Sequence, residues 1–297
     1  MPETVVYTRN HGSPYSKGLM AQSLSASGLS PERAYELAQL LERRLDEQVG
    51  RRIDVDDLRE LAEKVLGEQE GEEALKRFRD WRRVDRLDRP LIVMLAGTTG
   101  VGKSTLATML AHRLGITRVI ATDVIRQVLR AFFSKELLPA VHYSSFEAGE
   151  AVELVVDEAA DRDLVGFIRQ AESVGTGISA IVDRACQETT AMVLEGVHLI
   201  PGTLSEGLRR RCIPVEAVLA VPDEQVHRGH LLVRGGERPA ERYLSRFDQI
   251  RKLQGYLVER ARAEGVAVIE NQSVDQALPE MMDLVLEAVG RLSSSTR

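Results

Sequence analysis

The sequence predicts an α/β protein: a three-layer α/β/α domain on a mainly parallel five-stranded sheet, preceded by a small, mostly helical domain. Two observations carry this prediction. From about residue 89 onward, short apolar runs alternate with helical stretches, and a glycine-rich segment stands directly after the first run. Such alternation is typical of a parallel sheet whose strands are joined by crossover helices.

The five predicted strands are short apolar runs bounded by turns or helical patterns, as expected for a sheet buried on both faces. They span residues 91–96, 119–122, 191–195, 217–221 and 266–270. A helix is predicted at 103–114, directly after the glycine-rich segment. A long, mostly helical insertion at about 145–190 separates the second strand from the third.

Residues 1–88 show one strand pattern followed by four helical patterns. The strand is expected at 4–7 and the helices at 16–27, 30–49, 54–66 and 72–83. Ser30 followed by Pro31 is a good helix start, because serine caps a helix and proline fits its first position. The charge-rich stretch 82–90 is typical of a linker, so we place the domain boundary near residue 88, with the second domain over 89–297.

The composition narrows the classes of function. The 297 residues carry a net charge of −6, which argues against nonspecific binding to nucleic acid or to a membrane surface as the main role. The two cysteines are far apart and lack metal-ligand spacing, and no apolar run resembles a membrane span or a signal peptide. We therefore expect a cytoplasmic protein with a small-molecule partner; the sequence leaves open whether it forms a homo-oligomer.

The glycine-rich segment from Gly97 to Ser104, GTTGVGKS, fits the P-loop pattern G-x-x-x-x-G-K-[ST] between a predicted strand and a predicted helix. Its glycines let backbone N–H groups surround a phosphate, and the helix N-terminus adds partial positive charge. Lys103 is expected to neutralise the β- and γ-phosphates, and the Ser104 hydroxyl to ligate Mg²⁺. This motif indicates a P-loop NTPase fold, the alternative being a simple glycine turn.

Asp123 stands where the second predicted strand ends and a helix begins. The carboxyl ends of strands line the ligand crevice of an open α/β sheet, so Asp123 is placed to orient or deprotonate an acceptor hydroxyl. Arg126, one turn later, is placed to bind an anionic group of the acceptor. The alternative is that Asp123 only caps the helix.

Glu195 ends the third predicted strand, which is the Walker-B pattern of a carboxylate that holds Mg²⁺ through water or activates a nucleophile. His198, three residues on, is a candidate contact for the acceptor or a phosphate. The alternative for this lone histidine is a structural hydrogen bond.

Two further segments are candidates for substrate contacts. The stretch 228–239 surrounds a glycine pair with basic residues, Arg234 and Arg238 among them, and this is typical of a mobile lid that closes over a triphosphate. Its alternative is a solvated, charged helix and turn. Arg130, Lys135 and the segment 142–145 follow the Asp123 helix and are candidates for an anion pocket.

Four motifs in this order, GTTGVGKST, IATDVIR, HYSSFEA and LEGVHLIPG, resemble the 2-phosphoglycerate kinases. The N-terminal stretch VVYTRNHGSPYSKGLMAQSL and the later FRDWRRV resemble an ATP-cone, a small regulatory nucleotide-binding module that this family carries ahead of its kinase domain. Together the two resemblances cover nearly the whole chain.

The resemblance implies transfer of the γ-phosphoryl group of ATP, with Mg²⁺, to the hydroxyl of 2-phosphoglycerate, giving 2,3-bisphosphoglycerate. It implies catalytic roles for Lys103, Asp123 and Glu195, with Ser104 and Glu195 at the metal. The implied ATP contacts are Gly97, Thr98, Thr99, Gly100, Val101, Gly102, Lys103, Ser104 and Thr105. It also implies an acceptor site near Asp123, Arg126, Arg130 and the 142–145 segment, with Glu195 and His198 facing the reaction centre. The candidate lid adds Arg234 and Arg238 as expected substrate contacts.

Two alternatives remain open from the sequence. One is a P-loop kinase for another small anionic acceptor, such as a sugar acid, an inositol phosphate or an RNA-linked hydroxyl. The other is a nucleotide-sensing regulatory ATPase, which would hydrolyse ATP slowly without stimulation by any small acceptor.

Overall fold

The computed structural model describes residues 4–6, 16–26, 28–47, 53–84, 89–152, 161–233 and 240–294. The chain divides into two compact units. The first comprises Met1–Leu87, His112–Gly115 and Met282–Arg297, and the second comprises Asp88–Ala111 and Ile116–Met281.

The N-terminal unit contains a two-stranded antiparallel sheet and four helices. The strands are β1 (Thr4–Val6) and β2 (Ile53–Asp54), and the helices are α1 (Lys17–Ala26), α2 (Pro31–Glu47), α3 (Val55–Leu66) and α4 (Glu68–Val84). The four predicted helices are confirmed, with shifted ends. The predicted linker is wrong at its start, because α4 continues through residues 82–84; residues 85–88 lie outside the described part of the chain.

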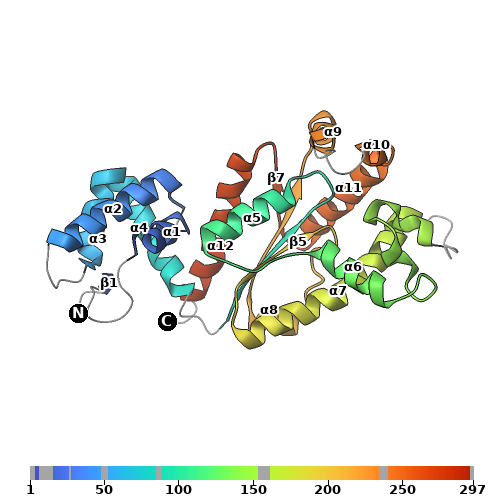
Figure 1. The fold of residues 1–297 in the computed structure, drawn as a ribbon, viewed down its shortest axis with the longest axis horizontal. Helices are drawn as coiled ribbons and strands as arrows, with labels where there is room; N and C mark the ends of the chain where they lie inside the picture. The colour runs from blue at the N-terminus through green and yellow to red at the C-terminus, as the bar shows by residue number, and fades with distance from the viewer. Residues whose placement is uncertain are drawn as a thin grey trace. The chain divides into compact units, whose positions relative to one another are not determined.

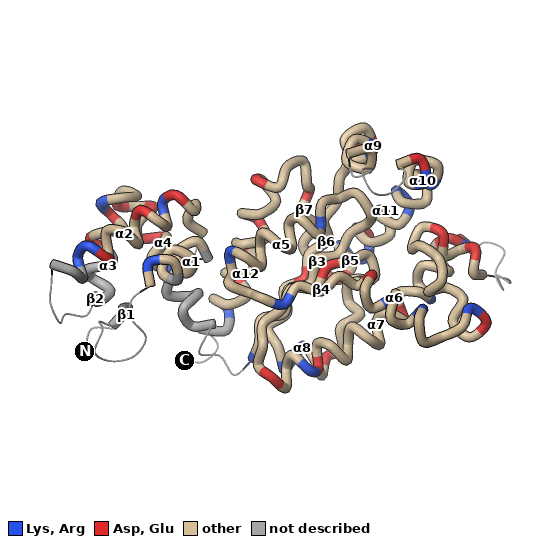
Figure 2. Tube along the Cα trace, in the orientation of Figure 1, with Lys and Arg blue, Asp and Glu red and all other residues tan. Residues whose placement is uncertain are grey.

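Helix α2 shows why this unit folds. Its residues Ala34, Leu37, Ala38 and Leu41 recur at helical spacing and are all fully or almost fully buried in the unit's apolar core. The backbone N–H of Arg33 donates a hydrogen bond to Ser30 Oγ at 3.4 Å, which confirms the predicted cap. Charged residues of both signs recur along α2 and α3 (Figure 2). Largely exposed ion pairs join α2 to α4 and to α3, and such pairs contribute little to stability.

The second unit is built on a five-stranded, all-parallel sheet, which confirms the predicted fold class. Its strands are β3 (Leu91–Ala96), β4 (Val119–Ala121), β5 (Met192–Gly196), β6 (Ile213–Ala220) and β7 (Ala267–Glu270), in the order β4-β5-β3-β6-β7. Strand β6 begins four residues before the predicted start. Pro214 and Glu216 interrupt its apolar pattern, yet both pair with residues of β3.

Between and after these strands lie the remaining helices. They are α5 (Lys103–Leu114), α6 (Thr122–Phe132), the 3₁₀ helices η1 (Pro139–His142) and η2 (Ser145–Ala151), α7 (Arg162–Glu188), α8 (Glu206–Arg211), α9 (Glu224–Val233), α10 (Ala240–Leu244), α11 (Phe247–Ala263) and α12 (Val274–Ser294). The last turn of α5, from His112, and the part of α12 from Met282 onward belong to the first unit. The predicted insertion at 145–190 consists of η2 and the long helix α7, apart from residues 153–160, which lie outside the described ranges. None of the helices in the described ranges is long and apolar enough to cross a membrane.

The arrangement of these helices opens a crevice at the carboxyl end of β3. Helices α7, α8 and α11 contribute to one core against a single face of the sheet, whereas α5 lies across the sheet from α7 (Figure 1). The connection that leaves β3 therefore runs over one face, and those that leave its neighbours β5 and β6 run over the other. Ligands bind at such a switch point in open α/β sheets, and here the glycine-rich segment occupies it.

The core between α7 and α11 yields a test of the fold. Phe167 is fully buried and its ring meets the Tyr256 ring edge-on, with centroids 6.1 Å apart. We expect Phe167→Ala to lower the free energy of unfolding of this unit by about 3–5 kcal/mol in urea titrations, because a cavity replaces the ring. Phe132→Ala is the matched control, since that ring is 82% exposed, and should change it by less than about 0.5 kcal/mol. Equal losses in the two variants would contradict this packing.

Candidate active site

The glycine-rich loop joins β3 to α5 with a backbone that only glycine adopts readily. Gly97, Gly100 and Gly102 have φ angles of 144°, 87° and 86°, all in the region that side chains disfavour. A Cβ on Gly97 would lie 2.5 Å from the carbonyl oxygen of Leu219 on β6, so the loop needs glycine there to pack against the sheet. The loop geometry thus follows from the predicted motif.

Three side chains bind the carbonyl groups of this loop from outside. His227 Nε2 donates to Thr99 O at 2.8 Å, His230 Nδ1 to Gly100 O at 3.1 Å, and Asn271 Nδ2 to Val101 O at 2.8 Å. In a trans peptide the C=O of one residue and the N–H of the next point in opposite directions, and the described residues contain no cis peptide. The N–H groups of residues 100–102 therefore face away from these side chains, as a phosphate cradle requires.

His227 is fully buried, and its burial lowers the pKa of the imidazole. Its Nε2 carries the proton that Thr99 O accepts, so Nδ1 is free to accept from Arg251 Nη1 at 3.5 Å. Neither His227 nor Asn271 is among the site residues predicted from the sequence. Asn271 directly follows β7, so the strand-end rule that singled out Asp123 would have found it, whereas nothing in the sequence marked His227.

Lys103, Ser104 and Glu195 meet at the end of β3. Lys103 is buried and its Nζ donates to Thr98 O at 2.6 Å, and Ser104 Oγ donates to Glu195 Oε1 at 2.8 Å. Strand register explains the second contact, because Leu95 of β3 pairs with Glu195 of β5. The structure thus brings together the two side chains that the sequence assigns to a metal.

This pair fits Mg²⁺ in the chemistry of its donors, a hydroxyl and a carboxylate oxygen. Within the described ranges, no group of three or more His, Cys, Asp and Glu side chains is close enough to hold a metal. Mg²⁺ in phosphoryl-transfer sites is bound by one or two protein oxygens, with substrate phosphates and water completing its shell. Ser104 and Glu195 match that small donor set.

A cavity of about 310 Å³ joins these residues to the candidate acceptor residues. Lys103, Ser104 and Glu195 line one part of it, and Asp123 and Arg126 line another, beside Ser144, Ser145 and Tyr243. Its volume is within the range of small-ligand sites. Thr105 and Arg130 are exposed and do not line the cavity, and Arg234 and Arg238 lie outside the described residues.

Asp123 is not the helix cap that the alternative interpretation proposed. The N-cap of α6 is Ala121, and no side chain caps it. Asp123 instead accepts a hydrogen bond from Arg126 Nε at 3.1 Å. The Asp123 side chain is 66% exposed. Partial desolvation opposes its ionisation, but the electrostatic influence of His198, Arg126 and Lys103 outweighs that effect and lowers the pKa of Asp123. Asp123 is therefore a carboxylate at neutral pH.

Arg126 is buried and largely engaged within the protein. Its Nη1 donates to Val141 O at 3.1 Å and to Tyr143 O at 3.0 Å. Among the described residues its Nη2 has no hydrogen-bond partner, so a donor remains at the cavity wall. The 142–145 segment that Arg126 holds carries Ser144 and Ser145 into the cavity lining.

The other members of the predicted anion pocket have different surroundings. Lys135 lies over the ring of Tyr143, 4.6 Å from its centroid, and does not line the cavity. His142 Nε2 donates to Phe133 O at 2.9 Å on the surface. Arg242 of α10, which follows the candidate lid, donates to Ser144 Oγ at 3.0 Å and so reaches the cavity's edge.

His198 is 2% exposed, and the cavity beside the P-loop does not include it. Its Nδ1 lies 2.8 Å from Thr122 Oγ1 and its Nε2 lies 3.0 Å from Gln170 Oε1. Burial lowers the pKa of His198 to about 4, so the ring is neutral at physiological pH. The structure thus places His198 within the protein's own hydrogen-bond network.

A switch-point P-loop, a strand-end carboxylate beside its serine, and a polar cavity with Asp123 define a P-loop phosphotransferase of the small-molecule kinase type. The chain is 34% identical over 284 residues to the 2-phosphoglycerate kinase of Methanopyrus kandleri, covering 94% of this chain and 86% of that protein. It is 37% identical over 278 residues to the one of Methanothermobacter thermautotrophicus, covering 92% and 90%. The chain belongs to the 2-phosphoglycerate kinase family, which confirms the resemblance seen in the motifs.

No family model matches the chain. The crystal structure of a gluconokinase from Sinorhizobium meliloti 1021 covers 70% of this chain and 98% of its own, with a TM-score of 0.44 and 17% sequence identity.

The buried, neutral state of His198 predicts a pH dependence of stability. Its pKa in the folded protein, about 4, is below the ordinary value of 6.5, so the unfolded chain binds the proton first as the pH falls. Stability is therefore fully present above pH 6.5 and declines by up to about 3 kcal/mol as the pH falls to 4. Chemical denaturation at a series of pH values should show a shallower decline in His198→Gln than in the wild type. Identical slopes would contradict a neutral, buried His198.

Proposed function

We propose that this protein is a 2-phosphoglycerate kinase, which converts ATP and 2-phosphoglycerate to ADP and 2,3-bisphosphoglycerate. One observation carries the proposal: relatives that bear this name match more than nine-tenths of the chain at about one-third identity. The structure supports it with one cavity that P-loop residues and Asp123 line together, which is the arrangement that direct transfer between two bound substrates requires.

In this reaction, the free hydroxyl oxygen of 2-phosphoglycerate forms a bond to the γ-phosphorus of ATP. The bond from that phosphorus to the β,γ-bridging oxygen breaks, and ADP leaves. Asp123 accepts a hydrogen bond from the acceptor hydroxyl and takes its proton as transfer proceeds. Its lowered pKa makes it a weak base, which suits a loose transition state that depends on positioning and charge more than on early deprotonation.

On the nucleotide side, the N–H groups of residues 100–102 and Lys103 bind the phosphates of ATP. Ser104 and Glu195 would hold Mg²⁺, which would supply positive charge to neutralise the phosphates during transfer. The 2.8 Å contact between these two side chains supports this assignment. Lys103 donates to Thr98 O in the structure, and this contact holds its ammonium group beside the loop where the phosphates bind.

On the acceptor side, the phosphate and carboxylate of 2-phosphoglycerate need cationic and hydroxyl donors. Arg126, Ser144 and Ser145 line the cavity and supply a guanidinium and two hydroxyls for this role. Arg130 of α6 belongs to the proposal as a residue of the acceptor's anion pocket, and Arg234 and Arg238 belong to it as residues of a lid that closes over the triphosphate. His198 belongs to it only through the network described in the next subsection.

The N-terminal unit is proposed to be the regulatory module. Its separate apolar core supports an independent domain over residues 1–88, ahead of a kinase domain over 89–297. The compact unit differs from that proposed domain in also including residues 112–115 and 282–297. The proposed function of that domain is that of an ATP-cone, which binds a nucleotide and modulates the kinase. A cytoplasmic location is part of the same proposal, and both cysteines are free thiols.

An acceptor panel tests the activity. Purified protein with Mg²⁺ and ATP is mixed with 2-phosphoglycerate, 3-phosphoglycerate, glycerate or no acceptor, and ADP release is followed. We expect selective ADP release with 2-phosphoglycerate and a bisphosphorylated product. Equally slow hydrolysis in all four mixtures would contradict the kinase assignment and favour a regulatory ATPase.

Lys103→Ala tests the P-loop. We expect kcat to fall by at least about 10³-fold, because the transferring phosphoryl group loses its lysine, while circular dichroism stays unchanged. Lys252→Ala is the control, because Lys252 of α11 forms partly exposed ion pairs with Asp161 and Asp163 and does not line the cavity. Retained activity in Lys103→Ala would place the active site elsewhere.

Ser104→Ala and Glu195→Gln test the metal assignment. We expect each variant to need about 10- to 100-fold more Mg²⁺ for half-maximal activity, because a ligand or its partner is lost. Ser173→Ala is the matched control, since that hydroxyl donates only to Arg169 O on the exposed side of α7. An unchanged Mg²⁺ requirement in both site variants would remove Ser104 and Glu195 from the metal site.

A further inference from the structure

The buried side chain of His198 links Thr122 of α6 to Gln170 of α7, next to the acceptor half of the site. His198 lies 2.8 Å from Thr122 Oγ1, at the start of α6, and 3.0 Å from Gln170 Oε1, in the middle of α7. Thr122 and Gln170 are fully buried, and His198 is almost so. A buried polar group is costly unless its hydrogen bonds are satisfied, so these contacts fix the separation of the two helices.

The link continues from Gln170 back to Asp123. Gln170 Nε2 donates to Ala140 O at 2.6 Å and to Tyr143 O at 3.0 Å. Tyr143 O also accepts from Arg126 Nη1 at 3.0 Å, and Arg126 Nε donates to Asp123 Oδ1 at 3.1 Å. Since Thr122 and Asp123 are neighbours in the chain, the hydrogen bonds form a closed ring, which we call the acceptor ring: Thr122, His198, Gln170, Tyr143 O, Arg126 and Asp123.

Donor and acceptor counting fixes the proton positions in the acceptor ring. The amide nitrogen of Gln170 donates to two carbonyls, so its Oε1 is the acceptor toward His198. His198 Nε2 therefore carries the proton, and Nδ1 accepts from the Thr122 hydroxyl. Every member then has its partners in one arrangement only, and such fully satisfied networks rigidify the groups that they join.

Gly196 is adapted to this ring. A Cβ at Gly196 would lie 1.8 Å from Thr122 Oγ1, so the residue after Glu195 must be glycine for the Thr122 hydroxyl to reach His198. The end of β5 thus brings Glu195 to Ser104 and, one residue later, leaves room for the Thr122 hydroxyl of the acceptor ring. This relates the spacing of Glu195, Gly196 and His198 in the sequence to the geometry of the site.

We propose that His198 and Gln170 are positioning residues for the acceptor: they hold Asp123 and the 140–145 segment at a fixed separation without touching substrate. The inference rests on the proposed function, because the acceptor is the one that the kinase assignment supplies. It gives the lone histidine, first a candidate substrate contact, an indirect role. The P-loop is held by other residues, His227, His230 and Asn271, so the ring acts on one substrate only.

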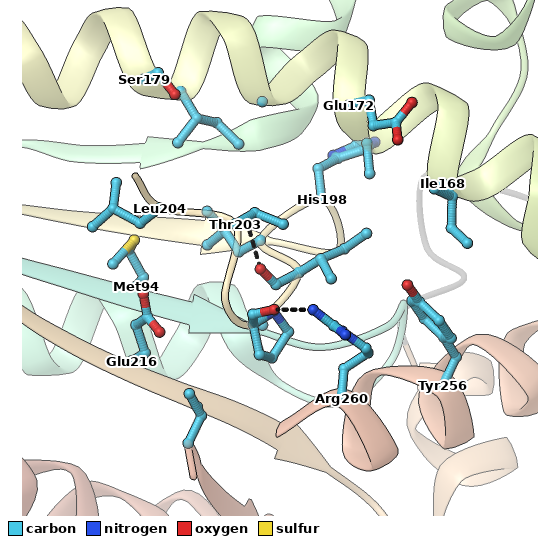
Figure 3. Close-up of a pocket in the computed structure, with 18 of the residues that line it drawn as sticks. Met94, Ile168, Glu172, Ser179, His198, Thr203, Leu204, Glu216, Tyr256 and Arg260 are labelled. Atoms are coloured by element: carbon cyan, nitrogen blue, oxygen red, sulfur yellow. Dashed lines mark hydrogen bonds between the residues drawn. The ribbon is translucent and has the colours of Figure 1, made fainter. Parts of the chain in front are cut away.

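A second cavity gives chemical access to the ring. It has a volume of about 530 Å³, lies between α7 and α11, and includes His198 in its wall (Figure 3). Truncation of His198 therefore leaves an imidazole-sized space that opens onto this cavity. Free imidazole can enter by this route and replace the missing ring.

Steady-state kinetics with both substrates test the proposal. We expect His198→Ala and Gln170→Glu to raise the KM for 2-phosphoglycerate by about 10- to 100-fold, since misplacement of about 1 Å costs that much, while the KM for ATP stays within twofold. Imidazole should restore His198→Ala and leave Gln170→Glu unchanged. His198→Gln retains only the donor toward Gln170 and provides a milder variant if His198→Ala does not fold.

Gln254→Glu is the matched control for loss of a buried amide. Gln254 is 6% exposed, and its amide exchanges two hydrogen bonds with the backbone of Val221, away from the acceptor ring. We expect it to lose thermal stability while the KM for 2-phosphoglycerate stays unchanged. If the ring variants likewise lose only stability, or if both KM values rise together, the positioning role is wrong.

A measurement that needs no acceptor separates this proposal from the proposed function. The ¹⁵N shifts of the His198 ring should report a neutral imidazole with its proton on Nε2 from pH 6 to 8. If the wild type does not phosphorylate 2-phosphoglycerate but shows this signature, the proposed function is wrong while the acceptor ring is supported. A charged imidazole, or a proton on Nδ1, would contradict the hydrogen-bond arrangement of the acceptor ring.

Discussion

The hydrogen bonds from His227, His230 and Asn271 to the loop carbonyls decide which way the peptide groups of the P-loop face. A glycine-rich loop has many accessible conformations, and only those that turn several N–H groups inward bind a phosphate. The three donors come from α9 and from the residue after β7, so the conformation of the loop depends on the packing of elements that lie far away in the sequence. The sheet and the crevice are arranged around that requirement.

Strand β5 connects this nucleotide half of the site to the acceptor half. Its pairing with β3 sets Glu195 beside Ser104, and the next residue, Gly196, gives Thr122 room to reach His198. The negative charge of Asp123 and the positive charges of Arg126 and Lys103 then share one polar cavity, and the two cations help to lower the pKa of Asp123. Positions and charges together supply what phosphoryl transfer needs from a protein.

The sequence was informative where local rules apply and silent where distant residues meet. The P-loop, the strand ends and the helix start at Ser30 follow from short patterns, and the structure contains them. The meeting of Ser104 with Glu195 followed from the rule that strand ends share an edge. Gln170 lay unnoticed in the long, mostly helical insertion, because the sequence does not show which partners a polar residue on a buried face will meet. His198 was noticed for its residue type, but its burial is a property of the folded core.

The two halves of the site draw on separate supports, and this separation has a consequence for how such proteins diversify. The nucleotide half rests on α9 and the residue after β7, and the acceptor half on α6, η1 and α7. The two halves share only Glu195 and Gly196 at the end of β5. Substitutions on the acceptor side can therefore accumulate without disturbing the phosphate cradle. The fold therefore combines a constant nucleotide-binding half with an acceptor-binding half that can change.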